Sequence, residues 1–236
     1  MDKNSDNNNN RLISIIAHDV KAPLAGFVSL TADLLENFDL FDKDEINEYV
    51  SVMHTASVRL YGLFNNLLEW ALLQNGGGSF NPADLNLYSE VENIVKFFSD
   101  TAANKSISIK NDIYVYMFVY ADKNMVASIL RNLISNAIKF SQPGGTITLS
   151  ACYTGQEVEI SVADTGIGMK KELIEKILKA DSWYSDHGTA GEQGTGLGLT
   201  LCREMVEKHG GTLSISSSPE QGTNVLFKLP AGPETH

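Results

Sequence analysis

The stretch that decides the fold lies near the middle of the chain and reads LRNLISNAIKFS at residues 130–141. Its apolar residues recur at helical spacing, which predicts a helix over residues 123–140. Asn132, Asn136 and Lys139 fall at positions i, i+4 and i+7 and so share one face of that helix. An amide oxygen is a ligand for a hard cation such as Mg²⁺, and an ammonium group one turn further on suits the phosphates that the cation bridges. This face is therefore a candidate phosphate site, with a solvated polar face as the alternative.

Two glycine-rich segments follow this helix. The first, DTGIGM at residues 164–169, comes directly after a predicted strand over residues 158–163. The Asp164 carboxylate can accept a hydrogen bond from an exocyclic amine such as that of adenine, and the glycines let the backbone turn beside a planar ring. The second, GTGLGL at residues 194–199, opens a predicted helix, and backbone amides at a helix N-terminus attract anions. It is not a Walker loop, because no Gly-Lys-Ser/Thr follows, and its glycines lack the spacing of the dinucleotide fingerprint.

A histidine stands in an amphipathic segment near the start of the chain, in AHDVKAPL at residues 17–24. At helical spacing, His18 lies roughly 160° from the centre of the apolar stripe, so it is predicted to point outward. Asp19 beside it can accept the proton of one ring nitrogen and leave the other a better nucleophile. The alternative is a solvated surface histidine.

The first third of the chain is predicted to be a helical hairpin. Apolar residues repeat at helical spacing over residues 12–38 and 46–71, and the short acidic segment 39–44 joins the two runs. Two helices share only one mutual face, yet both apolar stripes are broad. We therefore expect a second copy of the chain to cover the remainder in a dimeric four-helix bundle.

The rest of the chain is predicted to be an α/β domain with a mixed sheet and helices on one face. The expected helices cover residues 85–103, 123–140, 170–178 and 196–209. The expected strands cover residues 107–113, 116–120, 145–152, 158–163, 212–217 and 224–229.

Taken together, in this order and spacing, the segments resemble the sensor histidine kinases of two-component systems. His18 would stand in the histidine box, residues 132–141 in the asparagine box, and residues 164–169 and 194–199 in the two glycine boxes. The resemblance covers nearly the whole chain. It implies a dimerisation and histidine-phosphotransfer hairpin followed by an ATP-binding domain with an α/β sandwich fold, of the kind shared with gyrase and mismatch-repair ATPases.

The resemblance also implies domain boundaries and site residues. The expected domains are a linker remnant at residues 1–10, the hairpin at 11–76, a linker at 77–84, the ATP-binding domain at 85–232 and a tail at 233–236. Asn136 would ligate Mg²⁺ with support from Asn132, and Lys139 would contact phosphate. Asp164 would bind the adenine amine. The other residues expected to bind ATP are Phe140, Gly166, Gly168, Gly194, Thr195, Gly196, Leu197 and Gly198.

The implied activity is ATP-dependent phosphorylation of His18, polarised by Asp19, and transfer of the phosphoryl group to an aspartate in the receiver domain of a response regulator. The implied partners are a second copy of the chain and that regulator. Two alternatives are a degenerate dimeric docking module and a gyrase-like ATPase. Ala22 stands where many members carry Thr or Asn, which puts a phosphatase activity in doubt, and the segment 170–193, the expected lid, lacks the usual Phe-x-x-Phe run.

Composition excludes other classes of function. The chain has 236 residues, with 18 basic against 29 acidic side chains and a net charge of -11. This charge argues against a nucleic-acid binder or an anionic-membrane binder, both of which need a basic surface. With two cysteines and no long apolar run, we expect a reducing, cytoplasmic setting, with any membrane anchor elsewhere in a longer parent protein.

Overall fold

The computed structural model describes residues 20–21, 23–74, 80–178, 188–189 and 196–233. These residues fall into two compact units, Met1–Leu72 and Leu73–His236. Each unit is described below by itself. In the described part of the chain, no helix is long and apolar enough to cross a membrane.

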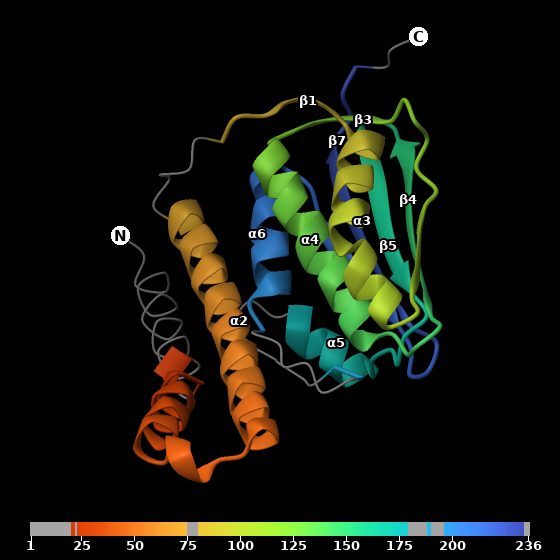
Figure 1. Cartoon of the computed structure of the whole chain (residues 1–236). Helices are drawn as coiled ribbons and strands as arrows, with labels where there is room; N and C mark the ends of the chain where they lie inside the picture. The colour runs from red at the N-terminus through yellow and green to blue at the C-terminus, as the bar shows by residue number, and fades with distance from the viewer. Residues whose placement is uncertain (1–19, 22, 75–79, 179–187, 190–195, 234–236) are drawn as a thin grey trace. The chain divides into compact units, whose positions relative to one another are not determined.

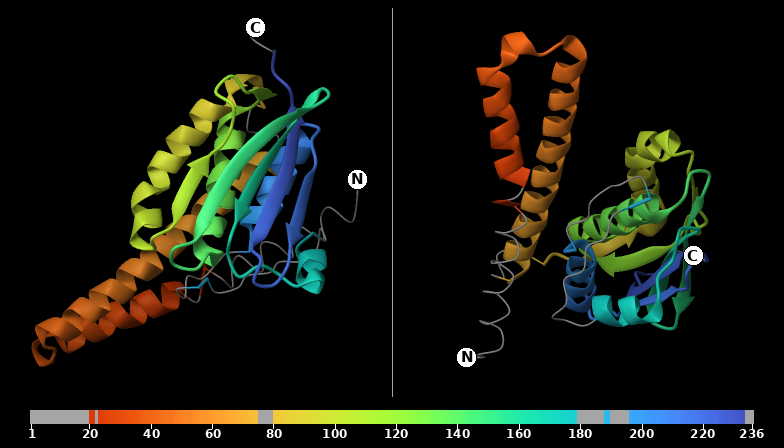
Figure 2. Two further views of the ribbon diagram at one scale, coloured as in Figure 1. Left: turned by 90° about the vertical axis from the view of Figure 1, so that its right-hand side faces the viewer. Right: turned by 90° about the horizontal axis from the view of Figure 1, so that it is seen from below.

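The first unit contains the predicted helical hairpin (Figure 2). Its first helix includes residues 20–21 and 23–36, a short 3-10 helix η1 (Phe38–Leu40) follows, and α2 (Lys43–Gln74) returns. The start of α2 is capped by Asp42, whose carboxylate accepts from the Asp44 and Glu45 amides, each at 2.8 Å. The Glu45 side chain accepts in turn from the Asp42 amide, so the two residues form a reciprocal capping box.

One polar network ties the two helices together near their connection. The Tyr49 hydroxyl donates to the Asp33 carboxylate at 2.6 Å, and the Asn37 amide donates to the other carboxylate oxygen at 2.8 Å. These two hydrogen bonds lower the pKa of Asp33, and the bond from Tyr49 has the larger effect. The Phe41 ring packs on Tyr49 with centroids 4.9 Å apart, so this end of the hairpin is both bonded and packed.

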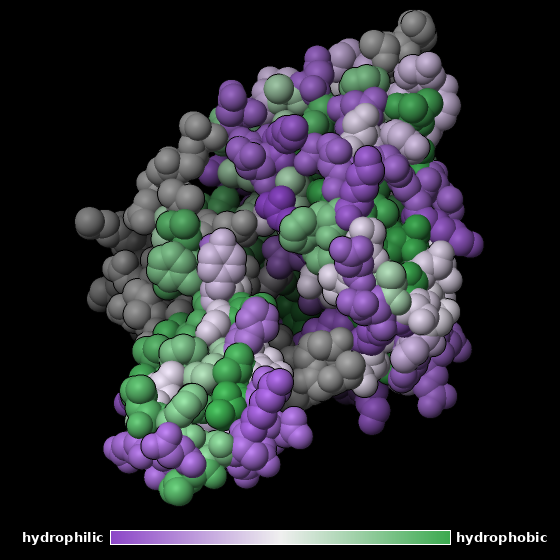
Figure 3. Space-filling model, in the orientation of Figure 1, coloured by the Kyte–Doolittle hydropathy of each residue, from purple (hydrophilic) through white to green (hydrophobic). Residues whose placement is uncertain are grey.

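Much apolar surface of the hairpin remains exposed in the single chain. Figure 3 shows apolar side chains gathered over this unit. Leu35 is 83% exposed and Phe64 is 62% exposed, whereas Leu63 beside it is buried. Exposure on this scale is typical of a face that another surface covers.

The second unit is built on a five-stranded sheet with the order β2-β4-β5-β7-β6. Its strands are β2 (Ser108–Asn111), β4 (Thr146–Thr154), β5 (Glu157–Asp164), β6 (Leu213–Ser217) and β7 (Thr223–Pro230). The β2–β4 pair is parallel and the other pairs are antiparallel, so the predicted mixed sheet is confirmed. A separate antiparallel pair joins β1 (Ala83–Asn86) to β3 (Phe118–Ala121).

Three helices lie on one face of this sheet, as predicted (Figures 1 and 2): α3 (Leu87–Asn104), α4 (Lys123–Phe140) and α6 (Gly198–Lys208). A short α5 (Lys171–Leu178) follows the first glycine-rich segment. Buried and half-buried residues alternate in the first half of β4 and along most of β5, as in sheets with one covered face. The core lies between helices and sheet, and its largest fully buried side chains include Ile129, Leu130, Ile134, Ile147, Leu149, Ile160, Phe227 and Leu229.

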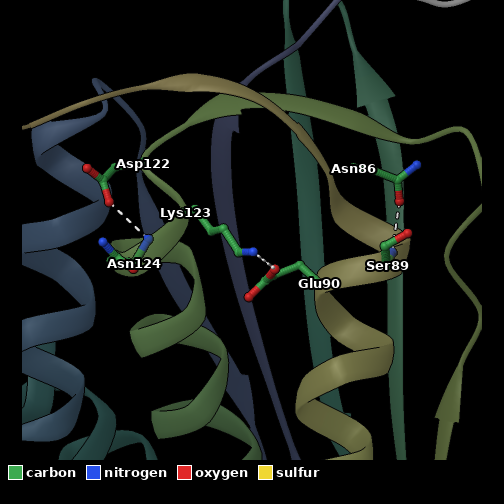
Figure 4. Close-up of polar contacts among 6 residues, drawn as sticks. All are labelled: Asn86, Ser89, Glu90, Asp122, Lys123 and Asn124. Atoms are coloured by element: carbon green, nitrogen blue, oxygen red, sulfur yellow. Dashed lines mark hydrogen bonds and ion pairs between the residues drawn. The ribbon is translucent and has the colours of Figure 1, made fainter.

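The start of this unit differs from the prediction. Residues 83–86 form β1, where the sequence predicted the end of a linker and the start of a helix. The helix begins at Leu87 because the Asn86 side chain accepts from the Ser89 amide at 2.8 Å and so caps it (Figure 4). The strand was missed because its pairing with β3 is a tertiary contact that four residues do not signal.

Residues 80–81, just before β1, contact the start of α4 and the end of α6. The Phe80 ring packs edge-on against His209 with centroids 4.9 Å apart, and the Asn81 amide donates to the Asp122 carboxylate at 3.0 Å. His209 is buried, its Nε2 accepts from the Asp122 amide, and its Nδ1 donates to the Met205 carbonyl. The histidine therefore has a structural role in this fold.

Candidate nucleotide-binding site

The helix α4 carries the polar face predicted from the sequence, with the bounds predicted for it. Asp122 caps its start by accepting from the Asn124 and Met125 amides at 3.0 and 3.2 Å, and Lys123 pairs with the Glu90 carboxylate on α3 (Figure 4). The apolar face of α4 is buried against the core. The three predicted side chains, Asn132, Asn136 and Lys139, are half-buried on the remaining face.

The second glycine-rich segment meets this face at Asn132. A Cβ added at Gly198, the first residue of α6, would lie 2.8 Å from the Asn132 Oδ1 atom, so any larger residue here would require the Asn132 side chain to shift. Asn132 itself donates to the Ser128 carbonyl at 3.1 Å. Gly196 has a φ of +70°, and a residue in that conformation cannot be part of an α-helix. The helix α6 therefore begins at Gly198, two residues later than predicted. Leu197 between them is buried.

The carboxylate of Asp164 lies at the end of β5. Its Oδ1 atom accepts from the Gly166 amide at 2.8 Å and from the Thr223 amide at 3.2 Å. Among the described residues, no donor is found for the second oxygen. Burial raises the pKa of Asp164, and the two backbone hydrogen bonds oppose that rise. The side chain is therefore a half-buried acceptor, held at Oδ1, whose second oxygen could accept from an amine.

The first glycine-rich segment is pressed between two neighbours. A Cβ at Gly166 would overlap the Phe140 carbonyl oxygen, and the Ile167 amide donates to that same oxygen at 3.1 Å. On the other side, a Cβ at Gly168 would overlap the Ser218 carbonyl oxygen, and Gly168 also has a φ of +65°. Both glycines are needed because backbone approaches them closely. They join the end of α4 to the turn between β6 and β7.

The structure thus brings Asp164 and the first glycine-rich segment to one end of α4, and places Gly198 against Asn132 on the same helix. Lys139 holds its ammonium 4.5 Å from the centroid of the Phe140 ring. The predicted site residues His18, Asp19, Gly194 and Thr195 lie outside the described residues. Most of the expected lid, residues 179–187 and 190–193, also lies outside them.

Sequence reasoning missed three groups at this site. The Thr223 amide has no sequence signal, because it reaches Asp164 only through the pairing of β5 with β7. Lys105 and Thr189 both bond to the end of α4, and neither stands in a recognisable motif.

Comparison with known proteins identifies this arrangement. Residues 121–233 match the family of histidine kinase-, DNA gyrase B-, and HSP90-like ATPases. The chain is 30% identical over 228 residues to the adaptive-response sensory kinase SasA of Crocosphaera subtropica, covering 93% of this chain and 59% of that protein. It is 29% identical over 227 residues to the sensor histidine kinase WalK of Bacillus subtilis, covering 95% of this chain and 37% of that protein.

Solved structures agree on the fold. The histidine kinase AdeS of Acinetobacter baumannii superposes with a TM-score of 0.74 at 20% identity, over 92% of this chain and 98% of that one. The histidine kinase ThkA, in a crystal structure with the response regulator protein TrrA, also gives 0.74 at 21% identity, over 96% of this chain and 63% of that one.

The second unit is therefore an ATP-binding domain of the histidine kinase and gyrase type. With the helical hairpin that precedes it, the chain is similar over most of its length to the catalytic core of sensor histidine kinases of two-component systems. The curated relatives are longer than this chain, which covers 59% of the Crocosphaera protein and 37% of the Bacillus protein.

Proposed function

We propose that this core transfers the γ-phosphoryl group of ATP to His18 and then to an aspartate of a response regulator. The observation that carries the proposal is the Asp164 carboxylate, which accepts from two backbone amides at one oxygen and has no donor among the described residues at the other. An adenine amine would donate to that oxygen. The matching family of ATPases and the kinases among the relatives support the same reaction.

In the proposed reaction, a ring nitrogen of His18 attacks the γ-phosphorus of ATP in line. A phosphorus–nitrogen bond forms, the bond from the γ-phosphorus to the bridging oxygen breaks, and ADP leaves with that electron pair. Asp19 would hold the proton of the other ring nitrogen. The Lys139 ammonium would offset negative charge on the terminal phosphates, as would the glycine-segment amides around Gly196.

Mg²⁺ is the metal that this site fits. Magnesium sites use one or two protein oxygens together with substrate phosphates, and the half-buried Asn136 amide offers such an oxygen beside Asn132. In the described part of the chain, no cluster of three His, Cys, Asp or Glu side chains forms a protein-only metal site. Bound to the phosphates, the ion would neutralise charge that develops during transfer.

The hairpin would supply both protein interfaces. Its exposed apolar side chains, such as Leu35 and Phe64, support the proposed four-helix bundle with a second copy. ThkA forms a complex with the response regulator TrrA, and by likeness to it a receiver domain would dock on this unit. We place the core in the cytoplasm, where ATP and such regulators are found.

The test separates a kinase from an ATPase. The chain is incubated with Mg²⁺ and γ-labelled ATP, and label on protein and released phosphate are measured together. A kinase gives label on the wild-type protein and none on His18→Gln. Phosphate release without protein label would instead support the gyrase-like alternative and overturn the proposal.

A further inference from the structure

The C-terminal turn of α4 carries both Lys139 and Phe140, and its backbone carbonyls are held from outside the helix. The last four carbonyl groups of any α-helix have no partner within it. In α4, the first of these four carbonyls belongs to Ala137, and it accepts from the Ser141 amide at 3.0 Å. The other three are satisfied by residues far away in sequence.

Lys105, the C-cap of α3, satisfies two of these carbonyls. Its ammonium donates to the Ile138 carbonyl and to the Lys139 carbonyl, each at 2.9 Å. A cation at the C-terminus of a helix also interacts favourably with the helix dipole. Because α3 and α4 pack side by side, this bond joins the ends of two neighbouring helices (Figure 1).

Thr189, in the connection between α5 and α6, makes the second external attachment. Its amide donates to the Lys139 carbonyl at 3.1 Å, and its hydroxyl donates to the Ser141 carbonyl at 2.7 Å. The same hydroxyl lies 3.2 Å from the Lys139 carbonyl, so the shorter bond to Ser141 is the principal one. With Lys105 and the Thr189 amide, both lone pairs of the Lys139 carbonyl are occupied.

The fourth carbonyl belongs to Phe140 and accepts from the Ile167 amide in the first glycine-rich segment. The last turn of α4 is therefore bonded to α3, to the connection between α5 and α6, and to the segment that follows Asp164. These attachments hold the backbone that carries the Lys139 and Phe140 side chains.

We propose that Thr189 is a positioning residue for phosphate binding: its hydroxyl holds the end of α4 so that the Lys139 ammonium faces the terminal phosphates of ATP. The inference rests on the proposed function, because it takes Lys139 as the phosphate contact. It assigns to Thr189 an effect on affinity for the triphosphate, exerted through Lys139, and none on binding of the nucleoside.

The test compares Thr189→Val with Thr189→Ser in the full chain. Valine keeps the size of the side chain and the backbone amide but loses the hydroxyl, whereas serine keeps the hydroxyl. The dissociation constants of ATP with Mg²⁺ and of adenosine are measured by titration calorimetry. Thr189→Val should bind ATP roughly 2- to 10-fold more weakly, the range for one lost hydrogen bond. Adenosine binding should stay within about twofold of wild type, and Thr189→Ser should behave as wild type.

A double-mutant cycle tests whether Thr189 acts through Lys139. In a Lys139→Ala background, Thr189→Val should cause no further loss of ATP affinity, because the side chain being positioned is gone. If valine at this site prevents folding, as shown by a thermal melt, Thr189→Ala takes its place with the same expected ratios.

Four results would overturn the inference: unchanged ATP affinity in Thr189→Val, equal weakening of ATP and adenosine, equal behaviour of the valine and serine variants, or additive losses in the cycle. Failure of the proposed function looks different. If the wild-type chain binds no ATP, the nucleotide site itself is wrong and the inference falls with it. If the wild type binds ATP normally and Thr189→Val leaves that affinity unchanged, only the inference is wrong.

Discussion

Replacing Asp164 with asparagine should separate nucleotide binding from the stability of the ATP-binding domain. The substitution conserves shape and keeps an oxygen for the Gly166 and Thr223 amides, which now donate to Oδ1 at 2.8 and 3.2 Å. It replaces the second oxygen by an amide nitrogen. That nitrogen is a donor, and it would face the adenine amine, which is also a donor.

The loss of binding follows from that one exchange. A hydrogen bond to a charged acceptor contributes about 1.5–3 kcal/mol, so ATP affinity should fall roughly 10- to 100-fold. Adenosine affinity should fall by the same factor, because the contact is to the base. The proposed phosphate contacts around Lys139 would be unchanged in the variant.

Stability should move in the other direction. Burial raises the pKa of Asp164, so the folded carboxyl holds its proton to a higher pH than the unfolded one. Between the two pKa values the folded state binds more protons, and stability falls as pH rises through that window. Above the window the ionised group carries its full desolvation cost. Asp164→Asn removes this cost, so its gain over wild type should be largest at neutral pH and shrink as pH falls through the window.

Urea unfolding at neutral and acidic pH, paired with calorimetric titration of ATP, measures both effects. We expect a free energy of unfolding at neutral pH that is unchanged or about 1 kcal/mol higher in the variant, together with the loss of binding. A variant that binds ATP as tightly as wild type would refute the assignment of Asp164 to the base. A variant that is destabilised at neutral pH would refute the account of its pKa.

Two further predictions concern the first glycine-rich segment and the hairpin. In urea unfolding, Gly168→Ala should destabilise the domain by about 2 kcal/mol more than Gly155→Ala. Both glycines have positive φ, but only a Cβ at Gly168 would overlap the Ser218 carbonyl. Equal losses of stability in the two variants would contradict this prediction. Tyr49→Phe should raise the pKa of Asp33 toward its ordinary value in NMR titrations, since the Tyr49 hydrogen bond is the main cause of its low value. Because the pKa of Asp33 is lowered in the folded state, its ionised form stabilises that state above the unfolded pKa, and this stabilisation is lost as pH falls. If the Asp33 titration is unchanged in Tyr49→Phe, the hydrogen bond does not form in solution.

The sequence predicted the elements whose patterns are local. The helix over 123–140 was predicted with its observed bounds, because its apolar period is complete and Asp122 caps it. The strand 158–163 and the hairpin were likewise confirmed, with small differences at those ends that the structure describes. Asp164 was a candidate because a carboxylate at a strand end, followed by two glycines, can accept a hydrogen bond from an exocyclic amine.

What the sequence did not reveal depends on contacts between distant segments. β1 exists only because residues 83–86 pair with β3, and four residues carry no pattern of their own. The attachment of Thr189 to the end of α4 spans 50 residues, and a threonine in a polar segment has no distinguishing spacing. The close approach of Gly198 to the Asn132 side chain is another such contact, at a position where the sequence alone suggested only an anion site.

The central claim is that His18 receives the phosphoryl group of ATP, and the chemistry of the phosphorylated product tests it most directly. After incubation with Mg²⁺ and γ-labelled ATP, the protein is denatured and the bound label is followed in acid and in alkali. The account predicts label that is lost in acid, stable in alkali, absent from His18→Gln and greatly reduced in Asp164→Asn. Label that resists acid, or that persists in His18→Gln, would contradict it.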